Sequence, residues 1–310
     1  MHAQTETDPR QLDIFSDSRD VMMRNDLIDA LARRQTSAAL GARSALAAEF
    51  PCDTLLAPAQ LLLDALADPV ACAGPHATAA PSLAAAREHL RSRVEPAAVA
   101  ALGLPAGRAW LAPLWRDLAQ RSHTVEWHGA RPDDHAAPLW LAAGDWALAA
   151  QAAASIASWR RIPAPLSWMA EARFRMGGVD AAWPLLAELA WLAPARLDAL
   201  LNCLGDTLLN RLRQRFEQDF DDAVGSSFDP RPGHAGVAWF PAWVLATTPA
   251  LARLLAMAQA GHATAPEHGM RLMVELLGLE RQGRHHDLVA RRKQLRDLCA
   301  PLYAAYMATR

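Results

Sequence analysis

The sequence predicts an all-α protein, an array of antiparallel helical hairpins that together form an α-solenoid. Apolar residues recur at spacings of three and four, as in Leu197, Leu200, Leu201 and Leu204, which is the period of one helix face. Strand signals are nearly absent, because the chain contains no Asn-Gly or Asp-Gly hairpin turn and only two tyrosines. Prolines and glycines separate the helical segments at intervals that are typical of hairpins.

Four segments end in the same way and are predicted as the second helices of hairpins. They run from Ser37 to Pro51, from Ala149 to Pro163, from Asp180 to Pro194 and from Asp287 to Pro301. Each begins with a small or acidic residue and closes with proline at one fixed offset. Proline lacks an N–H and clashes with the preceding turn, so we expect these four prolines at or just past helix ends.

The tryptophans are numerous for this length, eleven in all, and most of them follow helical spacing. Helical spacing of aromatic residues indicates a core position more often than a binding surface. Trp183 and Trp191 belong to one predicted helix. We therefore expect both to be buried between neighbouring hairpins.

Part of the chain, about residues 139–194, resembles the tetratricopeptide repeat. The matching residues are Gly144, Asp145 and Trp146 at the turn between helices, Ala149 and Ala182 at helix crossings, and Pro194 at the end. The match is partial, because the interval from Ala149 to Asp180 is shorter than the usual repeat. The resemblance implies stacked hairpins with a groove for a protein partner.

The predicted organisation is a flexible N-terminal tail, residues 1–16, followed by a single helical-repeat domain, residues 17–310. Breaks rich in glycine and proline near 73–81, 128–138 and 225–236 predict loops within that domain. With 52% hydrophobic residues, the chain has enough apolar side chains to bury a large core.

Charge and cysteine content exclude several function classes. The 31 basic and 33 acidic residues leave a net charge of −2, so the chain as a whole has no electrostatic attraction to nucleic acid or anionic lipid. The four cysteines form no Cys-x-x-Cys pair, which argues against a zinc knuckle and a disulfide framework.

The sequence also predicts a compartment. No apolar segment of a signal peptide follows the polar start, and the uncharged stretch from Ala235 to Ala252 is interrupted by Pro241 and Pro249. We therefore expect a cytoplasmic protein with no membrane partner. Arginine supplies nearly all basic residues, and alanine is abundant, which indicates a GC-rich bacterial genome.

One polar segment contains the densest set of residue types that bind metals. These are His123, Glu126, His128, Asp133 and His135. Zinc helices place two histidines and a glutamate in H-E-x-x-H or H-x-x-E-H order, whereas Trp127 moves His128 one position out of that register. The alternatives are a metal-dependent enzyme that uses this segment and a polar surface loop without metal. No cofactor is otherwise predicted, and no motif identifies a catalytic residue or a small-molecule substrate.

A local excess of basic residues lies near the C-terminus. Its members are Arg284, Arg291, Arg292, Lys293 and Arg296. Such a cluster can contact phosphates. However, Leu288 and Leu295 form an apolar stripe in the same segment, so the basic residues are also the expected solvated face of an amphipathic helix. The second interpretation is the simpler one, and nucleic acid is not the partner that we predict.

The five residues Gln11-Leu12-Asp13-Ile14-Phe15 resemble the pentapeptide by which bacterial replication and repair proteins bind the β sliding clamp, commonly Gln-Leu-Ser/Asp-Leu-Phe. Ile14 stands where that family favours leucine. In the family, the glutamine hydrogen-bonds in one subsite while the leucine and phenylalanine enter an apolar pocket. The resemblance implies that a sliding clamp is a partner. The alternative is that the apolar residues pack on the first hairpin, ahead of a helix that begins near residue 16 or 17.

These observations together predict a non-enzymatic adaptor. Its helical array would present a groove to a protein partner, and its N-terminal tail would provide a second attachment. The metal-dependent enzyme described above is the alternative function.

Overall fold

The regular structure is helical throughout the part of the chain that the computed structural model describes, residues 9–67, 80–221, 236–259, 261 and 263–310. Side chains of residues 9–18, 80–82, 219 and 221 lie outside the described part. Within the described ranges there is no β-strand, and this confirms the predicted all-α class. None of the described helices combines the length and the apolar character needed to cross a membrane.

The chain divides into two compact units, Met1–Gly144 and Asp145–Arg310. The division falls inside the segment that resembles the tetratricopeptide repeat. Gly144 adopts a left-handed conformation, with φ 79° and ψ 11°, and so ends helix α7 (Ala136–Ala143). Glycine suits this position because it has no Cβ to clash. The single domain predicted for residues 17–310 stays a prediction.

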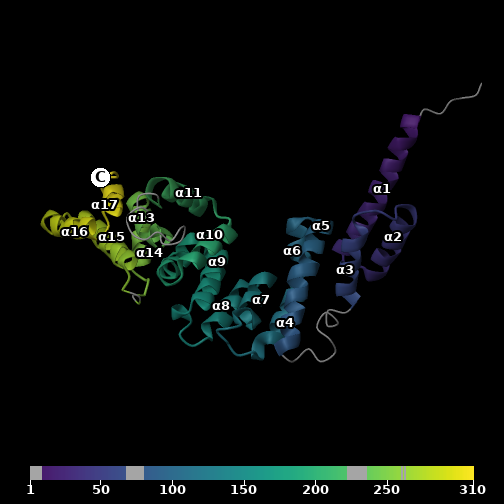
Figure 1. The fold of residues 1–310 in the computed structure, drawn as a ribbon, viewed down its shortest axis with the longest axis horizontal. Coiled ribbons are helices and arrows are strands. Elements are labelled where there is room, and N and C mark those ends of the chain that lie inside the picture. The colour runs from purple at the N-terminus through teal and green to yellow at the C-terminus, as the bar shows by residue number, and fades with distance from the viewer. Residues whose placement is uncertain (1–8, 68–79, 222–235, 260, 262) are drawn as a thin grey trace, which may run out of the picture. The chain divides into compact units, whose positions relative to one another are not determined.

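The first unit consists of consecutive helices that pack on their neighbours (Figure 1). They are α1 (Pro9–Ala32), α2 (Thr36–Glu49), α3 (Leu56–Ala67), α4 (Ala80–His89), the π-helical segment η1 (Leu90–Val94), α5 (Glu95–Leu102), α6 (Leu104–Arg121), the 3₁₀ turns η2 (Ser122–Thr124) and η3 (Pro132–Asp134), and α7. Helix α1 packs on α2 and α3, α3 packs on α5, and α6 packs on α5 and α7.

The core of the first unit is formed by one apolar face of each helix. Its fully buried side chains include Leu27, Leu31, Ala39, Leu46, Leu62 and Leu111. Helices α5 and α6 approach each other closely at Gly107, where an added Cβ would lie 2.9 Å from the backbone of Ala98. Glycine at this position lets the two backbones pack together.

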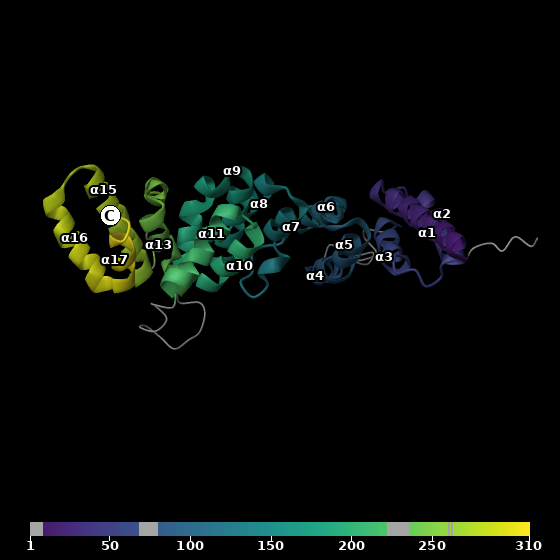
Figure 2. The same cartoon turned by 90° about the horizontal axis from the view of Figure 1, so that it is seen from above.

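The second unit continues with further helices (Figure 2). They are α8 (Trp146–Ala154), η4 (Trp159–Arg161), α9 (Pro163–Leu192), α10 (Pro194–Leu204), α11 (Thr207–Phe216), η5 (Glu217–Asp221), η6 (Gly236–Trp239), α13 (Phe240–Thr247), η7 (Pro249–Leu251), α14 (Ala252–Leu255), α15 (Ala265–Arg281), α16 (His285–Leu298) and α17 (Ala300–Met307). Helix α9 contains a break at Gly178, where φ is 68° and ψ is −162°. Glycine suits this break because a positive φ has no Cβ penalty there.

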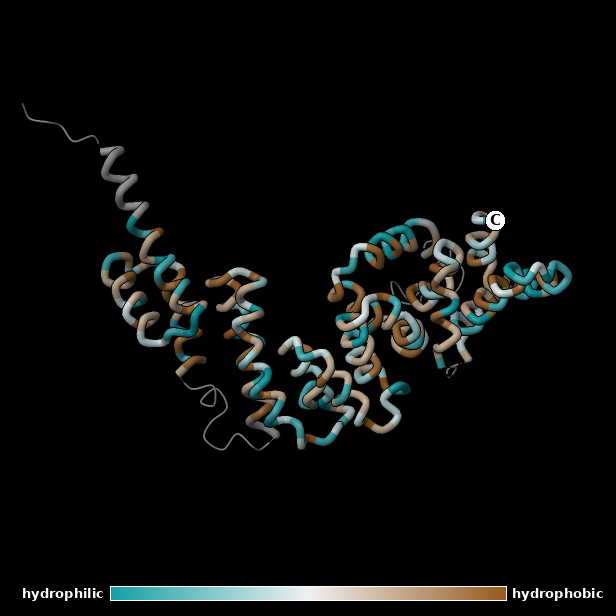
Figure 3. The backbone as a smooth tube through the Cα atoms, turned by 180° about the vertical axis from the view of Figure 1, so that it is seen from behind, coloured by the Kyte–Doolittle hydropathy of each residue, from teal (hydrophilic) through white to brown (hydrophobic). Residues whose placement is uncertain are grey.

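Aromatic rings fill the centre of the second unit. Trp183 meets Phe240 edge to face at 6.2 Å between ring centroids, and Phe216 meets Phe240 and Trp243 at 5.5 Å each. Trp183 is fully buried and Trp191 is 6% exposed, so the predicted burial of these two tryptophans is confirmed. Along the helices of both units, apolar and polar residues alternate, as expected for helices that bury one face (Figure 3).

Three of the four predicted helix-ending prolines lie where the sequence places them. Pro51 follows the end of α2. Pro194 is the first residue of α10 and Pro301 is the second residue of α17, and each of these helices begins directly after the preceding one ends. A proline in the first helical turn costs the helix no backbone hydrogen bond, because an N–H at that position would have no partner within the helix. The same residue type thus separates one helix from the next at each of these positions.

The prediction for Pro163 is wrong, because α8 ends at Ala154 and the turn η4 intervenes before Pro163 opens α9. The hydroxyl of Ser155 donates a hydrogen bond of 2.8 Å to the carbonyl of Ala152. Serine side chains compete in this way with the backbone ladder of a helix. Ser158 then adopts a left-handed conformation with φ 57°.

Candidate functional site

The five residues considered as metal ligands lie along the connection between α6 and α7. His123, Glu126, His128 and Asp133 are exposed, whereas His135 is buried. In the described part of the chain, no three histidine, cysteine, aspartate or glutamate side chains come together in a group that would hold a metal ion. The structure therefore does not bring these five residues together.

His135 has a structural role in this connection. Its Nδ1 accepts a hydrogen bond of 3.2 Å from the amide of Ala137, which caps the N-terminus of α7. Burial lowers the pKa of His135. The lowered pKa favours the neutral imidazole, which is the form that can accept this bond.

Aspartates of the same connection bind arginines of the preceding helices. Asp134 forms a largely buried ion pair with Arg87 of α4 and lies 3.6 Å from Arg131. Asp133 lies 3.7 Å from Arg91 of η1, with both side chains about half exposed. These carboxylates therefore fasten the connection to α4 and η1. The partner of Asp134, Arg87, lies too far away in sequence for any spacing rule to identify it.

The basic cluster near the C-terminus is engaged with carboxylates. The shortest nitrogen–oxygen distances are 2.6 Å from Arg284 to Asp287, 2.8 Å from Arg291 to Glu275, 3.3 Å from Arg292 to Glu280 and 3.5 Å from Arg296 to Asp297. Lys293 is exposed. A phosphate would have to compete with these carboxylates for the four arginines.

Glu280 organises part of this region. It accepts hydrogen bonds from the hydroxyl of Tyr306, from Arg292 and, at 2.9 Å to each oxygen, from Arg310. Burial alone would raise the pKa of Glu280, but the hydrogen bonds from Tyr306 and Arg310, the charge of Arg310 and the bond from Arg292 outweigh it and lower the pKa. This network holds α17 against α15.

The residues that resemble a clamp-binding pentapeptide, Gln11 to Phe15, lie within α1, which begins at Pro9. The helix therefore starts before residue 16 or 17, where the sequence placed its beginning. The side chains of these five residues lie outside the described part. Clamp binding and the flexible tail of residues 1–16 stay predictions.

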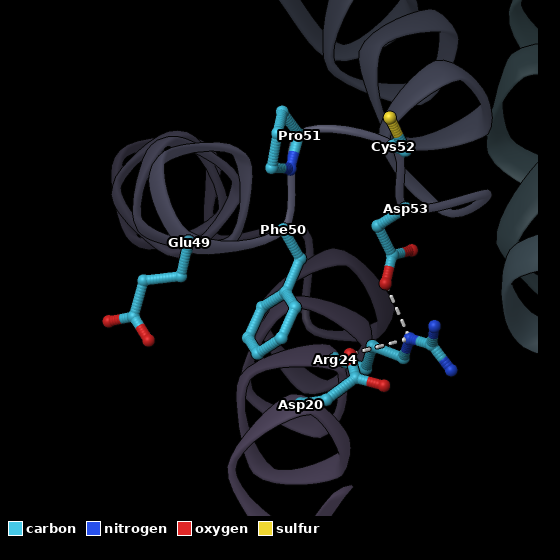
Figure 4. Close-up of a pocket in the computed structure, with 7 residues that line it drawn as sticks. All are labelled: Asp20, Arg24, Glu49, Phe50, Pro51, Cys52 and Asp53. Carbon is cyan, nitrogen blue, oxygen red and sulfur yellow. Dashed lines mark hydrogen bonds and ion pairs between the residues drawn. The ribbon is translucent and has the colours of Figure 1, made fainter. Parts of the chain in front are cut away.

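A pocket of about 370 Å³ opens where α1 meets the connection between α2 and α3 (Figure 4). Its lining consists of Asp20, Arg24, Glu49, Phe50, Pro51, Cys52 and Asp53. Asp20 and Arg24 belong to α1, Glu49 ends α2, and the other four residues form the connection. The sequence identified Pro51 as a helix stop but gave no sign of the pocket around it.

An ion-pair network fixes one side of the pocket. Arg24 Nε donates a hydrogen bond of 2.6 Å to Asp53 Oδ2 and lies 3.1 Å from Asp20 Oδ1. Asp53 Oδ1 accepts from the amide of Leu55 at 2.7 Å. Burial would raise the pKa of Asp53, but the bonds from Leu55 and Arg24 outweigh it and lower the pKa. Asp53 is therefore a buried anion, and each of its oxygens already accepts a hydrogen bond.

The opposite side of the pocket is more open. Glu49 Oε1 lies 2.6 Å from Arg19 Nη2, and the side chains of these two residues are 38% and 66% exposed. The ring of Phe50, which is half-buried, lies between Glu49 and Asp20 (Figure 4). The pocket thus combines one aromatic ring with carboxylates on either side of it, an arrangement suited to a cationic group.

No protein-family model, no curated protein and no solved structure matches this chain.

Proposed function

We propose that this chain is a non-enzymatic cytoplasmic adaptor. In this proposal, hairpins of the tetratricopeptide type present a groove to a protein partner, and the N-terminal segment attaches the chain to the bacterial β sliding clamp. The observation that carries the proposal is the order Gln11-Leu12-Asp13-Ile14-Phe15 at the start of the chain. Short segments with one polar and two apolar anchors are a common means of attachment between proteins.

The packing of consecutive helices supports the adaptor architecture. In the first unit α1 packs on α2, and α5 on α6; in the second, α8 packs on α9 and α15 on α16. Repeated packing between neighbours in sequence is the construction principle of helical solenoids, which expose long surfaces to partners. Gly144 with its left-handed backbone, followed by Trp146 at the start of α8, also fits the turn of that repeat type.

Exposed apolar side chains on α1 support attachment through the N-terminal segment. Val21 is 50% exposed and Met22 is 65% exposed. In sequence they follow Ile14 and Phe15 by seven residues each, which corresponds to about two turns of an α-helix. A partner that binds the pentapeptide would therefore find further apolar surface on the same helix.

Binding of the full chain to a purified bacterial sliding clamp tests the proposal. Surface plasmon resonance should show saturable binding with a Kd in about the micromolar range, since a short segment must give up ordering entropy on binding. Replacing Gln11 and Phe15 together by alanine should weaken binding by about tenfold or more, because both anchors are lost.

The matched control replaces Ser16 and Asp17 by alanine, two neighbours outside the pentapeptide, and it should bind as the parent does. Equal affinities for the anchor variant and the parent, or no saturable binding by the parent, would contradict attachment through this segment. Thermal melting of both variants checks that neither change alters the fold.

A further inference from the structure

We propose that the pocket at the junction of α1 and the α2–α3 connection binds a basic side chain, arginine or lysine, of a protein partner. This inference rests on the proposed adaptor function, because it assumes that the ligand belongs to another protein. The class of ligand follows from the charge of the pocket lining and from the aromatic ring in it.

The charge of the lining favours a cation. Three carboxylates, those of Asp20, Glu49 and Asp53, and one guanidinium, that of Arg24, leave a formal charge of −2 in the lining. Asp53 is 1% exposed and bound to Arg24 and the Leu55 amide. Asp20 in turn lies 3.1 Å from Arg24. Glu49 is therefore the carboxylate placed to receive an incoming cation.

Phe50 provides a surface for that cation. Its ring lies between Glu49 and Asp20 (Figure 4), and cations bind favourably over aromatic faces. The chain uses the same interaction elsewhere, with Arg310 over the ring of Tyr306 at 4.9 Å. A basic side chain lying on Phe50 would place its apolar stem on the ring and its charged end near Glu49.

The rim already holds a guanidinium that can be exchanged. Arg19 lies 2.6 Å from Glu49, yet both side chains are exposed, and ion pairs in such positions contribute little stability. An incoming basic side chain that contacts both Glu49 and Phe50 would form an ion pair with Glu49, as Arg19 does, and would also form a cation–π contact with Phe50. Arg19 would then turn toward solvent at small cost.

An anionic ligand fits the pocket less well. Arg24 is the only cation of the lining, and its Nε already lies within 3.1 Å of both Asp20 and Asp53. A carboxylate or phosphate at Arg24 would lie beside two carboxylates of the same charge, which disfavours its binding. The lining thus favours a positive ligand over a negative one.

The test uses the full chain and the peptide acetyl-Gly-Arg-Gly-amide, with citrulline in place of arginine in a second peptide as the neutral isostere. Ligand-observed NMR should show saturable binding of the arginine peptide, and the citrulline peptide should bind at least about tenfold more weakly because its charge is lost. Glu49→Gln should weaken arginine binding severalfold, and Glu49→Gln combined with Phe50→Leu should reduce it further.

Glu88→Gln is the matched control, since Glu88 is an exposed carboxylate of α4 outside the pocket. This variant should bind the arginine peptide with the same affinity as the parent. Equal binding of the arginine and citrulline peptides, or an unchanged affinity in Glu49→Gln, would overturn the assignment. The Glu49→Gln chain should still bind the sliding clamp. Clamp binding is therefore tested by the Gln11 and Phe15 variant, and peptide binding is tested by the pocket variant. Failure of one proposal can be distinguished from failure of the other.

Discussion

The guanidinium of Arg34 lies over the indole ring of Trp110, 4.8 Å from the ring centroid, and donates a hydrogen bond of 2.8 Å to the carbonyl of Trp110. The indole in turn donates from Nε1 to the carbonyl of Leu31 at 2.8 Å. The two residues therefore join the end of α1 to α6 through one stacking contact and two hydrogen bonds. Burial lowers the pKa of Arg34, but guanidinium groups remain charged in proteins at any physiological pH.

Replacing Arg34 by methionine should lower the free energy of unfolding of the first unit by about 1–3 kcal/mol. The change removes a charged donor from the Trp110 carbonyl and a cation from the ring, while keeping most of the apolar stem. Urea denaturation monitored by circular dichroism measures the difference. Arg33→Met is the control, because Arg33 is exposed and its nearest ion-pair partner, Asp29, lies 3.5 Å away. It should change the free energy by no more than about 0.5 kcal/mol, and equal effects of the two substitutions would contradict this account.

Local signals in the sequence were sufficient to predict the helical class and several helix ends. Pro51, Pro194 and Pro301 mark transitions between helices because proline acts on its own turn. Burial of Trp183 and Trp191 follows from apolar periodicity. The exception is Pro163. Helix α8 ends at Ala154, next to Ser155, whose hydroxyl bonds to the carbonyl of Ala152, and a serine in an alanine-rich helix is only a weak signal of a helix end.

The candidate site could not be predicted, because it depends on residues that are far apart in sequence. Arg24 and Asp53 meet only once α1 and the α2–α3 connection have packed. In the basic cluster, the pair Arg284–Asp287 has a spacing that helical geometry anticipates, whereas Arg291 reaches Glu275 on another helix. His135 illustrates the opposite error. Its residue type indicated a metal ligand, while its position before α7 makes it a helix cap.

Arg160 and Glu188 should show strong energetic coupling. Arg160 Nε and Nη2 each donate a hydrogen bond of 2.8 Å to Glu188, whose side chain is 5% exposed, and the amide of Gln259 donates to the same carboxylate at 2.7 Å. Arg160→Met leaves a buried carboxylate without its cation and should cost about 3–5 kcal/mol. Combining it with Glu188→Leu should cost less than the sum of the single changes, with a coupling energy of at least about 1 kcal/mol.

The control for this double-mutant cycle is the pair Arg253–Asp180 of the same unit. Its atoms lie 4.0 Å apart, and both side chains are mostly exposed, so its coupling energy should be within about 0.5 kcal/mol of zero. Chemical denaturation of the single and double variants of both pairs gives the two coupling energies. Similar values for the buried and the exposed pair would refute the role assigned to burial here.

The network around Glu280 should make the packing of α17 sensitive to acid. The folded pKa of Glu280 lies below its ordinary value of 4.5, so the unfolded chain binds a proton on this group more readily than the folded chain does. The stabilisation is therefore complete above pH 4.5 and is lost as the pH falls through the lowered folded pKa. Hydrogen exchange of α17 amides, measured from pH 6 to pH 3, should show protection that decreases over the lower part of this range.

Two variants separate Glu280 from the other carboxylates that titrate over the same range. Glu280→Gln cannot lose a proton, so the decrease in α17 protection between about pH 4.5 and pH 3 should become shallower than in the parent. Tyr306→Phe removes a hydroxyl donor to Glu280, which moves the folded pKa of this carboxyl back toward its ordinary value, so protection should begin to fall at a higher pH. If Glu280→Gln retains the full acid-dependent loss, another carboxylate is responsible, and the lowered pKa of Glu280 makes no contribution to the stability of α17.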